Sequence, residues 1–398
     1  MKILKVTPYY EPDFHLGGVV RSTSLLCREL VKLGHEVCVY TTQHPSVTTR
    51  HPLGVPIDLG GVKVIYFKNR FDGFAFGLDM LRASKSVSEF DVVHIVAFWQ
   101  IFGLPALLQA WRFSVPTVHS PRGSLVMVRD PSPGAFKHRA FYWMLNHHIL
   151  KRASAVHFTA ELERSDARVL GFRVPSFCLP NAVPVEEFSS LPSRSESRVK
   201  LGINDQKPVI AFIGRLDRRK ALDMLLRAFS KASGPVEEAN LFLAGPDGGE
   251  KDKLEELIRE LGLDQRVRFL GLINSEQRLQ ILAAADLLTL TSLAENFGNA
   301  GAEALAAGVP VLITDQCGVA EGVEEAGVGR VIPVDQDALT RALEEMLGDP
   351  EELKKMGSRG PEFAASRYAA REVAKSTALA YADLCSGTRS PECRWGQD

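Results

Sequence analysis

Two carboxylates stand eight positions apart in a run of small residues, ENFGNAGAE, at residues 295–303. Phe297 is the one bulky side chain between Glu295 and Glu303, and the glycines allow an anion to approach the backbone. Carboxylates on either side of an anion site can accept hydrogen bonds from hydroxyl groups. A phosphate with a sugar on one side and a ribose on the other would fit this pattern. The competing interpretation is an ordinary helix start with Glu303 as a solvated surface residue.

A second stretch, GRLDRRKALDMLLRAF at residues 214–229, carries cations. Arg215 comes directly after an apolar strand pattern and a glycine, and Lys220 opens a helical pattern. A planar guanidinium and a compact ammonium together suit a diphosphate. A solvated basic loop explains Arg218 and Arg219 well, but it does not explain an arginine at the end of a strand.

A third stretch, DFHLGGVVRS at residues 13–22, places Gly17 and Gly18 before a helical pattern. Their backbone amides could contact a phosphate. A Gly-Gly pair taken alone favours a simple turn, so this stretch gains meaning only beside the other two.

The elements that must position these residues alternate between strands and helices. Residues 2–7 predict a buried strand, leucines at helical spacing predict a helix ended by Gly34, and residues 36–41 predict the next strand. Residues 91–98 and 116–120 predict further strands. In the second half, six apolar segments are each followed by a helical pattern or a helix start: VIAFIG, LFLAG, VRFLG, LLTLT, VPVLIT and GRVIPV. The alternation predicts an α/β fold with parallel, doubly wound sheets.

This order places the first two stretches at one edge of a sheet. Glu295 follows the strand predicted at 287–292, and Glu303 lies in the early turns of the next helix. Ligands bind at the carboxyl edge of open parallel sheets, and the free amides near 298–300 form an anion site at a helix N-terminus.

The chain of 398 residues is long enough for two domains, and its charge is divided unevenly. Residues 1–180 hold 21 Lys and Arg against 13 Asp and Glu, a net of +8, and residues 181–398 have a net of −9. A polar stretch at 185–206 is predicted to be the linker between the domains. The asymmetry suggests domains with different partners.

Several classes of protein are disfavoured. Six scattered cysteines without a CxxC pair predict reduced thiols in the cytoplasm, not a disulfide framework or a zinc site. No secretory signal is visible at the start. The apolar stretch at 92–113 contains polar residues, Gly103 and Pro105, so it predicts a buried strand and a helix instead of a membrane span.

Together these segments resemble the family-four retaining glycosyltransferases, the glycosyl transferases of group 1. The resemblance covers nearly the whole chain and rests on residues 8–41, on GRLDRRKALDMLLRAF and LFLAGPDGGE, and on residues 292–323, which include the family's Glu-x7-Glu signature. It implies the GT-B fold of two facing Rossmann-like, doubly wound domains with a deep interdomain cleft. The expected acceptor domain is 1–190, the donor domain is 191–370, a helix at 371–387 packs back on the first domain, and 388–398 form a tail.

The resemblance also implies roles for individual residues. The activity would be a retaining, hexosyltransferase-type transfer from a nucleoside-diphosphate sugar, with Glu295 on the donor sugar, Glu303 on the ribose, and Arg215 and Lys220 on the diphosphate. The loop of Gly17 and Gly18 would close on the donor. Backbone amides would assist at four further positions: Phe297, Gly298, Asn299 and Ala300.

Charge arguments predict that no metal or other cofactor is needed. Two cations and a helix N-terminus would neutralise the leaving diphosphate. The one Asp-x-Asp, residues 335–337, follows a strand and opens a helix, so it is interpreted as a helix cap.

One departure from the family pattern concerns HSPRGSL at residues 119–125. Many relatives carry His-Gly there, whereas here Arg122 stands in the histidine's place and His119 lies three residues earlier; a subset of relatives shares Ser-Pro-Arg-Gly. No catalytic histidine is assigned. Both residues are candidates for contact with the acceptor or the sugar, and Arg122 is equally open to a structural role.

The acceptor is less constrained by the sequence. The resemblance implies that the acceptor is a carbohydrate, either a growing bacterial polysaccharide, free or lipid-linked, or a glycolipid, and not a nucleic acid. Residues 112–152 hold seven Lys and Arg against one acid, Asp130, with aromatic residues between them. This predicts either contact with an anionic membrane surface, as a peripheral cytoplasmic protein at its inner face, or a partly buried helix with solvated cations.

Two other functions compete. A GT-B nucleotide-sugar epimerase would need a dedicated acid and base, and the Glu-x7-Glu pattern argues against it. A non-catalytic nucleotide-sugar-binding protein would be expected to lack Lys220 or Glu295, and both are present. Turnover of the donor distinguishes all three functions.

Overall fold

The computed structural model describes residues 1–14, 17–44, 50–68, 78–97, 101–125, 147–171, 174–203 and 207–387. Backbone contacts divide the chain into two units. The first consists of Met1–Ala182 and the segment from Ala370 onward, and the second is Val183–Ala369. The sequence predicted the boundaries at 190 and 370.

The first unit contains an eight-stranded sheet in the order β3-β4-β2-β1-β5-β6-β7-β8. All neighbouring pairs are parallel except β3 with β4. The strands are β1 (Lys2–Tyr9), β2 (Glu36–Thr42), β3 (Pro56–Leu59), β4 (Val62–Phe67), β5 (Val92–Val96), β6 (Thr117–Ser120), β7 (Ala155–Phe158) and β8 (Ser176–Cys178). The four strands predicted in this half are confirmed as β1, β2, β5 and β6.

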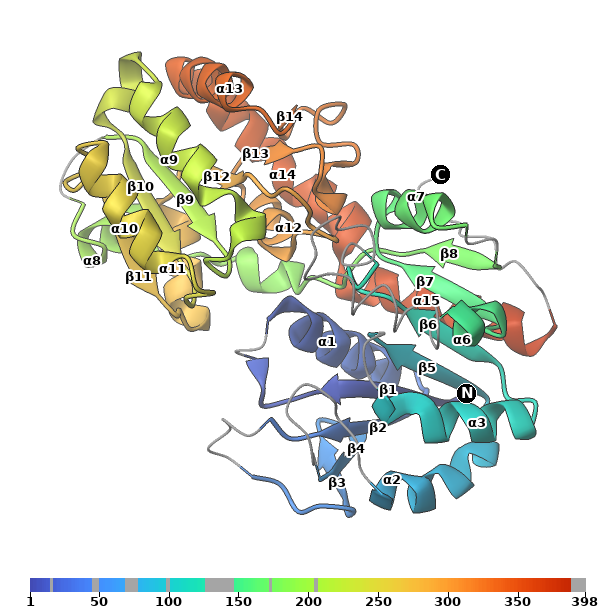
Figure 1. Ribbon diagram of the computed structural model, residues 1–398. Helices are drawn as coiled ribbons and strands as arrows, with labels where there is room; N and C mark the ends of the chain where they lie inside the picture. Colours follow the sequence, from blue (N-terminus) through green and yellow to red (C-terminus); the bar gives the residue numbers. More distant parts are fainter. Residues whose placement is uncertain are drawn as a thin grey trace. The chain divides into compact units, whose positions relative to one another are not determined.

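Helices cover the two faces of this sheet. On one face α1 packs against α15, the last helix of the chain, and on the other α3 packs near α2 (Figure 1). The helices are α1 (Gly18–Lys32), α2 (Leu78–Ala83), α3 (Leu104–Arg112), α6 (His147–Lys151), α7 (Glu161–Val169) and α15 (Ala370–Cys385). The stretch at 92–113 is β5 followed by α3, as predicted. Within the described ranges, no helix has the length and apolar character needed to cross a membrane.

The second unit contains a six-stranded sheet in the order β11-β10-β9-β12-β13-β14, and every pair is parallel. The strands are β9 (Val209–Ile213), β10 (Asn240–Ala244), β11 (Val267–Gly271), β12 (Leu287–Leu290), β13 (Val311–Thr314) and β14 (Gly329–Ile332). These are the six strands that the sequence predicted. Their order reverses between β9 and β12, which makes this the switch point of a doubly wound sheet.

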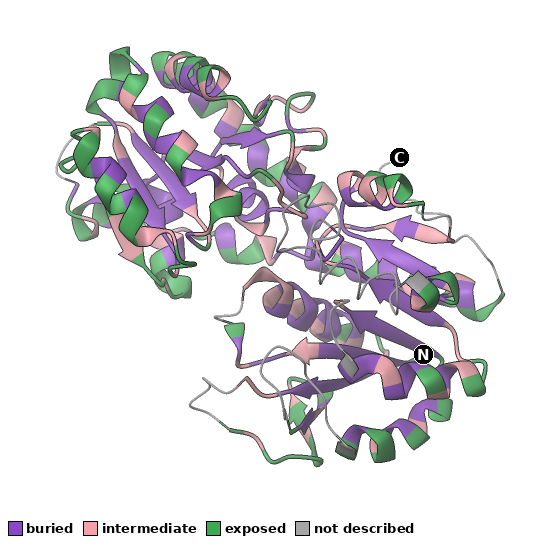
Figure 2. Ribbon diagram, viewed as in Figure 1, coloured by how far each residue is buried: buried purple, intermediate pink, exposed green. Residues whose placement is uncertain are grey.

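Two groups of helices enclose this second sheet. In one group α9 packs against α10 and α13; in the other α12 packs against α14, and α11 against α8. The helices are α8 (Arg194–Lys200), α9 (Leu222–Lys231), α10 (Lys251–Glu260), α11 (Ser275–Ala284), α12 (Asn299–Ala306), α13 (Gln336–Gly348) and α14 (Pro350–Tyr368). Figure 2 shows buried residues concentrated along the strands and exposed residues on the outer helices. Both units therefore have the Rossmann-like architecture that the sequence predicted.

The prediction of a polar linker over 185–206 is wrong in part. Residues Val185–Phe188 form a 3₁₀ turn, η6, and α8 lies within the same stretch. The reason is Arg198, whose buried guanidinium donates to the Lys207 carbonyl and pairs with Asp286 at 3.0 Å. These contacts hold a polar helix against the second unit.

Candidate functional site

The loops after β9 and β12 lie together at the carboxyl edge of the second sheet. Because the two strands are neighbours, the loops that leave them meet at the switch point. The Leu293 N–H donates to the Arg219 carbonyl at 2.7 Å, and the Thr291 hydroxyl donates to the Lys220 carbonyl at 2.8 Å. Main-chain and side-chain bonds thus fix one loop against the other.

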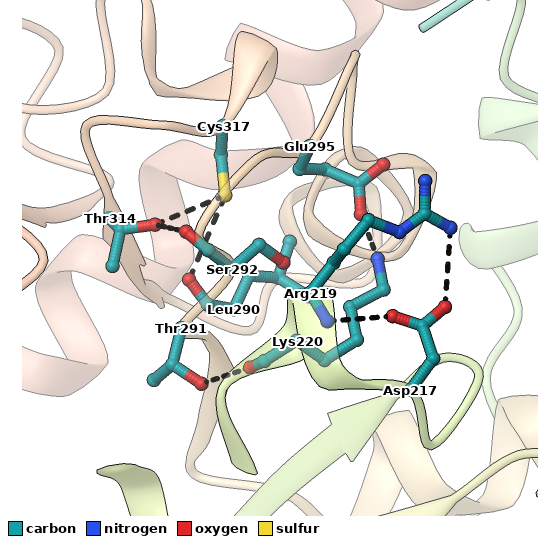
Figure 3. Close-up of polar contacts among 9 residues, drawn as sticks. All are labelled: Asp217, Arg219, Lys220, Leu290, Thr291, Ser292, Glu295, Thr314 and Cys317. Carbon is teal, nitrogen blue, oxygen red and sulfur yellow. Dashed lines mark hydrogen bonds and ion pairs between the residues drawn. The ribbon is translucent and has the colours of Figure 1, made fainter. Parts of the chain in front are cut away.

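Lys220 and Glu295 form an ion pair across these two loops (Figure 3). Their side chains are 16% and 21% exposed, so the pair is partly shielded from water. Lys220 ends the 3₁₀ turn Arg218–Lys220 directly before α9, and the next residue, Ala221, has a φ of 44°. This left-handed residue separates the turn from the helix. Two residues that the sequence assigned to neighbouring parts of one ligand therefore contact each other.

Main-chain hydrogen bonds connect the Glu295 loop to the loop after β13. The Glu295 N–H donates to the Gln316 carbonyl at 2.8 Å, and the Gly318 N–H donates to the Glu295 carbonyl at 3.1 Å. Cys317 lies buried beneath the loop, and burial raises the pKa of its thiol to about 11. A protonated thiol at this depth is a packing group of the loop.

The N-terminus of α12 presents its amides beside this ion pair. Gly298, the residue before α12, has a φ of 98°, and a Cβ there would lie 3.1 Å from Val319 and 3.3 Å from Leu290. Bonding within the helix begins at the Gly301 N–H, which donates to the Gly298 carbonyl at 2.9 Å. The amides of Asn299 and Ala300 precede that bond, in the first turn of the helix, where the positive end of the helix dipole lies.

Phe297 anchors the turn into α12. Its ring is buried and meets Tyr368 edge-on, with ring centroids 5.4 Å apart. The side chain therefore belongs to the core, and what Phe297 can offer a ligand is its backbone amide.

Glu303 is not a solvated surface residue, and that interpretation of the sequence is wrong. Its side chain is buried and forms an ion pair with Arg278 of α11. Arg278 is not among the residues predicted from the sequence, because it ends the polar run that begins α11 and resembles a solvated arginine there.

Arg215 lies at the same edge because three glycines bring two loops into close contact. The Leu216 N–H donates to the Pro246 carbonyl, and the Gly248 N–H donates to the Leu216 carbonyl, both at 2.9 Å. A Cβ at Gly245 would lie 1.9 Å from the Gly214 carbonyl oxygen, so no larger residue fits there. The Arg215 side chain is exposed and forms no ion pair with the part of the chain that the structure describes.

The glycine pair of the first unit occupies the start of α1. Gly17 precedes the helix with a φ of 113°, and Gly18 is its first residue. The left-handed backbone at Gly17 explains the need for a glycine there.

Arg122 and His119 flank the carboxyl end of β6 in the first unit. Arg122 has a φ of 52°, its guanidinium donates to the Asn181 side chain, and burial lowers its pKa to about 10. The next amide, that of Gly123, donates to the buried Glu163 carboxylate at 2.7 Å. His119 is buried, and burial lowers its pKa to about 4. The imidazole is therefore neutral at pH 7.

The Asp-x-Asp of residues 335–337 is a helix cap, as predicted. The Asp335 carboxylate accepts from the Ala338 N–H at 2.7 Å at the start of α13, and Asp337 pairs with Lys231 at 2.7 Å.

Most of the basic stretch at 112–152 lies outside the described residues, including Lys137 and Arg139. At its described end, the Arg152 guanidinium lies 5.3 Å from the centroid of the Trp111 ring. The predicted tail at 388–398 also lies outside the described residues.

A buried polar cluster in the first unit was not expected from the sequence. Lys5 of β1 is fully buried, and its ammonium lies 2.7 Å from His94 Nδ1. The Tyr381 hydroxyl of α15 lies 2.5 Å from the same nitrogen, and the Tyr381 ring lies 5.6 Å from the ammonium. Burial lowers the pKa of Lys5 to about 7.

The hydrogen bonds of this cluster have a defined direction. His157 Nε2 lies 2.9 Å from the Leu179 carbonyl, which can only accept, so that nitrogen carries the proton. Burial lowers the pKa of His157, and its neutral Nδ1 therefore accepts from the Ser120 hydroxyl at 2.9 Å. Ser120 in turn accepts from His94 Nε2 at 2.7 Å. The unprotonated His94 Nδ1 then faces the Lys5 ammonium and the Tyr381 hydroxyl as an acceptor.

Comparisons with known proteins match each of the two units to a family model. The family described as glycosyl transferases group 1 matches residues 193–363, and the glycosyl transferase 4-like domain matches residues 17–182. A D-inositol 3-phosphate glycosyltransferase of Nocardia farcinica is 36% identical over 179 residues, which are 43% of this chain and 40% of that protein. The match therefore spans less than half of the length of either protein.

Two solved structures resemble the whole chain. Sucrose-phosphate synthase from Thermosynechococcus elongatus has a TM-score of 0.78 at 19% identity, covering 97% of this chain and 100% of the other. Anabaena HepE in complex with UDP-glucose has a TM-score of 0.74 at 21% identity, again covering 97% and 100%. At these identities the similarity establishes the fold that the structures share.

Proposed function

Because the chain belongs to the glycosyltransferases of the GT-B fold, with a glycosyl transferase 4-like domain followed by a group 1 domain, we propose that it transfers a hexose from a nucleoside diphosphate to an acceptor hydroxyl with retention of configuration. The observation that carries this proposal is the meeting of Lys220, Glu295 and the N-terminus of α12 at the switch point of the second sheet. A cation, a carboxylate and the positive end of a helix suit the charges and hydroxyls of a sugar diphosphate.

The proposed binding mode assigns each group by its chemistry. Lys220 and Arg215 face the diphosphate, and the amides from Phe297 to Ala300 hold its oxygens at the positive end of α12. Glu295 accepts hydrogen bonds from hydroxyls of the sugar. Glu303 accepts hydrogen bonds from the ribose.

The reaction breaks the bond between the anomeric carbon and the diphosphate oxygen. Positive charge develops on the sugar and negative charge on the leaving diphosphate, where the two cations and the helix amides stabilise it. The acceptor oxygen attacks from the face that the diphosphate leaves, and its proton passes to a phosphate oxygen. This front-side course retains the configuration. We also propose that no metal ion is needed, because the leaving charge is already opposed by protein groups.

The donor and the acceptor are proposed from the relatives. HepE is described with UDP-glucose, which makes a UDP-sugar the first donor to test. The Nocardia relative is named for D-inositol 3-phosphate, and sucrose-phosphate synthase for a phosphorylated sugar. A carbohydrate acceptor, free or linked to a lipid, fits these names and the basic character of residues 1–180.

Donor turnover tests the proposal. The purified protein is incubated with UDP-, GDP- and ADP-glucose after thermal-shift screening, and the products are followed by NMR. Release of a nucleoside diphosphate is expected, with the sugar transferred to water when no other acceptor is added and first observed as the α-anomer. Formation of an epimer would indicate the epimerase instead, and tight binding without any turnover would indicate a non-catalytic binding protein.

A further inference from the structure

We propose that Arg278 is a positioning residue for nucleotide binding, which holds the Glu303 carboxylate in the place where the ribose meets it. The inference rests on the proposed function through the role of Glu303. Arg278 itself contacts no reacting atom; it acts through the carboxylate beside it.

Three contacts with two other elements, the helix α12 and the turn η6, hold the guanidinium. Arg278 comes from α11, and its side chain is only 7% exposed. It forms an ion pair with Glu303 of α12, and its second terminal nitrogen lies 3.4 Å from Glu187 of the 3₁₀ turn η6. The guanidinium carbon lies 5.4 Å from the centroid of the Phe188 ring. The ion pairs engage the two terminal nitrogens separately, and the ring contact engages the central carbon.

The fold alone gives no reason to bury this pair. Removing a charged pair from water is costly, and apolar residues of similar volume often replace such pairs without loss of stability. Here the carboxylate lies in the second turn of a helix whose first turn is the proposed phosphate site. A fixed carboxylate next to a phosphate site is useful to a nucleotide, because the ribose is the group attached to the phosphate.

An arginine suits this role better than a lysine. The planar fork of the guanidinium fixes the orientation of a carboxylate, whereas an ammonium group acts as a point charge on a flexible stem. Arg278→Lys keeps the positive charge and removes the planar fork. It therefore distinguishes fixing the orientation of the Glu303 carboxylate from neutralising its charge.

Arg266 offers a matched control in the same unit. Its guanidinium lies 4.3 Å from the centroid of the Phe229 ring and donates to the main-chain carbonyls of Val236 and Ala239. It is therefore an arginine that stacks on a phenylalanine but contacts no residue of the proposed site.

Calorimetry with paired ligands tests the proposal. Wild type is first titrated with UDP, GDP and ADP, and the tightest of these is compared with its analogue lacking both ribose hydroxyls. Arg278→Gln should weaken binding of the parent nucleotide by about tenfold and binding of the analogue by less than about twofold, as expected for loss of hydrogen bonds to a charged group.

Further comparisons test how Arg278 acts. Glu303→Gln should weaken binding of the same ligands to the same extent, and the double variant should bind no more weakly than either single variant. Arg278→Lys should recover only part of the loss, and Arg266→Gln should lower the melting temperature without changing nucleotide affinity.

Three outcomes would overturn the inference. Equal losses for the parent nucleotide and the analogue would place Arg278 at the phosphate or in the general fold. Additive losses in the double variant would mean that it does not act through Glu303. Unchanged affinity in Arg278→Gln would leave the proposed function intact and remove only this role, whereas a wild type that binds none of the three nucleotides would remove both.

Discussion

Lys220 and Glu295 lie 75 positions apart in the sequence, yet their charged groups are paired at the carboxyl edge of the second sheet. The proposed function assigns the ammonium to a diphosphate and the carboxylate to a sugar. The two groups therefore neutralise each other before a donor arrives. In the proposed function a diphosphate at Lys220 would compete with Glu295 for the ammonium group, and a carboxylate released in this way would be available to the sugar hydroxyls.

The first prediction concerns the cations. Arg215→Ala and Lys220→Ala should each weaken donor and nucleoside-diphosphate binding by about ten- to a hundredfold and lower turnover, because each removes a charge-assisted contact of roughly 1.5–3 kcal/mol. Calorimetry and initial rates measure both effects. Arg227→Ala, on the following helix, serves as the control. If both variants keep full affinity and rate, the diphosphate binds elsewhere.

The second prediction separates the two glutamates. Glu295→Gln should tighten binding of a bare nucleoside diphosphate by about two- to fivefold, because opening a partly exposed ion pair costs on the order of 0.5–1 kcal/mol. Turnover should fall, because the neutral amide of glutamine is a weaker hydrogen-bond acceptor for the sugar hydroxyls than a carboxylate is. Glu303→Gln should instead weaken the bare nucleotide. Equal effects of the two substitutions on nucleotide affinity would contradict this division of roles.

The third prediction is activity without a metal ion. With two cations and a helix N-terminus at the leaving diphosphate, a divalent ion has little charge left to neutralise. Turnover should therefore change at most about threefold when the protein is dialysed against EDTA and assayed without added metal. An absolute requirement for Mg²⁺ or Mn²⁺ would refute the charge argument.

Sequence reasoning located the edge of the sheet better than it located the partners of the residues there. Hydrophobic periodicity places Lys220 and Glu295 after two strands of one parallel sheet, and the rule for such sheets puts both at its carboxyl edge. That these two strands, β9 and β12, are neighbours is seen only in the folded chain. Nothing in the local pattern marks Arg278, since the Glu303 carboxylate that keeps it buried lies 25 positions away. The helix α8 was not predicted for the same reason, because the ion pair of Arg198 with Asp286 forms only in the folded chain.

The first unit illustrates the same limit more strongly. A lysine inside the strand pattern at 2–9 gives no sign of being fully buried. Its surroundings depend on His94 and on Tyr381, which are themselves 287 positions apart. Local patterns specify elements, whereas contacts of this separation are decided by how the elements pack.

The fourth prediction follows from the buried Lys5. Burial lowers its pKa from 10.5 to about 7, so between these values the unfolded chain holds a proton that the folded chain lacks. The free energy of unfolding should therefore rise with pH across this window, by about 1 kcal/mol per unit. Below pH 7 Lys5 is protonated in both the folded and the unfolded chain, and the free-energy cost of burying its charged ammonium stays at its largest.

Lys5→Met tests this assignment. It should melt at a higher temperature than wild type at pH 7, and the difference should shrink toward pH 9, because the variant lacks the proton that couples stability to pH. His94 Nδ1 keeps the Tyr381 hydroxyl as a partner. Lys63→Met, at an exposed position of β4, is the control and should follow wild type at each pH. A constant difference between Lys5→Met and wild type over this range would contradict the assignment.

The fifth prediction concerns the basic first half. If a lipid-linked acceptor is met at a membrane surface, the protein should co-sediment with anionic vesicles more than with neutral ones. Salt should weaken this binding, because each contact is worth about 1 kcal/mol and is screened over roughly 8–10 Å. A variant with four cations changed to Ala should bind less: Lys137, Arg139, Lys151 and Arg152.

The matched control for the vesicle experiment removes four exposed lysines of the second unit: Lys231, Lys253, Lys354 and Lys355. It should bind vesicles as wild type does, and both variants should keep their affinity for the donor. Equal binding to neutral and anionic vesicles would favour a soluble acceptor.

The nesting of the second unit within the sequence of the first affects how the protein is made. A ribosome completes Val183–Ala369 before it synthesises α15, so the second unit can fold while the first is still unfinished. Until α15 emerges, the part of α1 that packs against α15 is uncovered, and Lys5 and His94 lack Tyr381. The unit whose synthesis starts first is thus the last to be completed, and its nascent form is the part of the chain that a chaperone would need to protect.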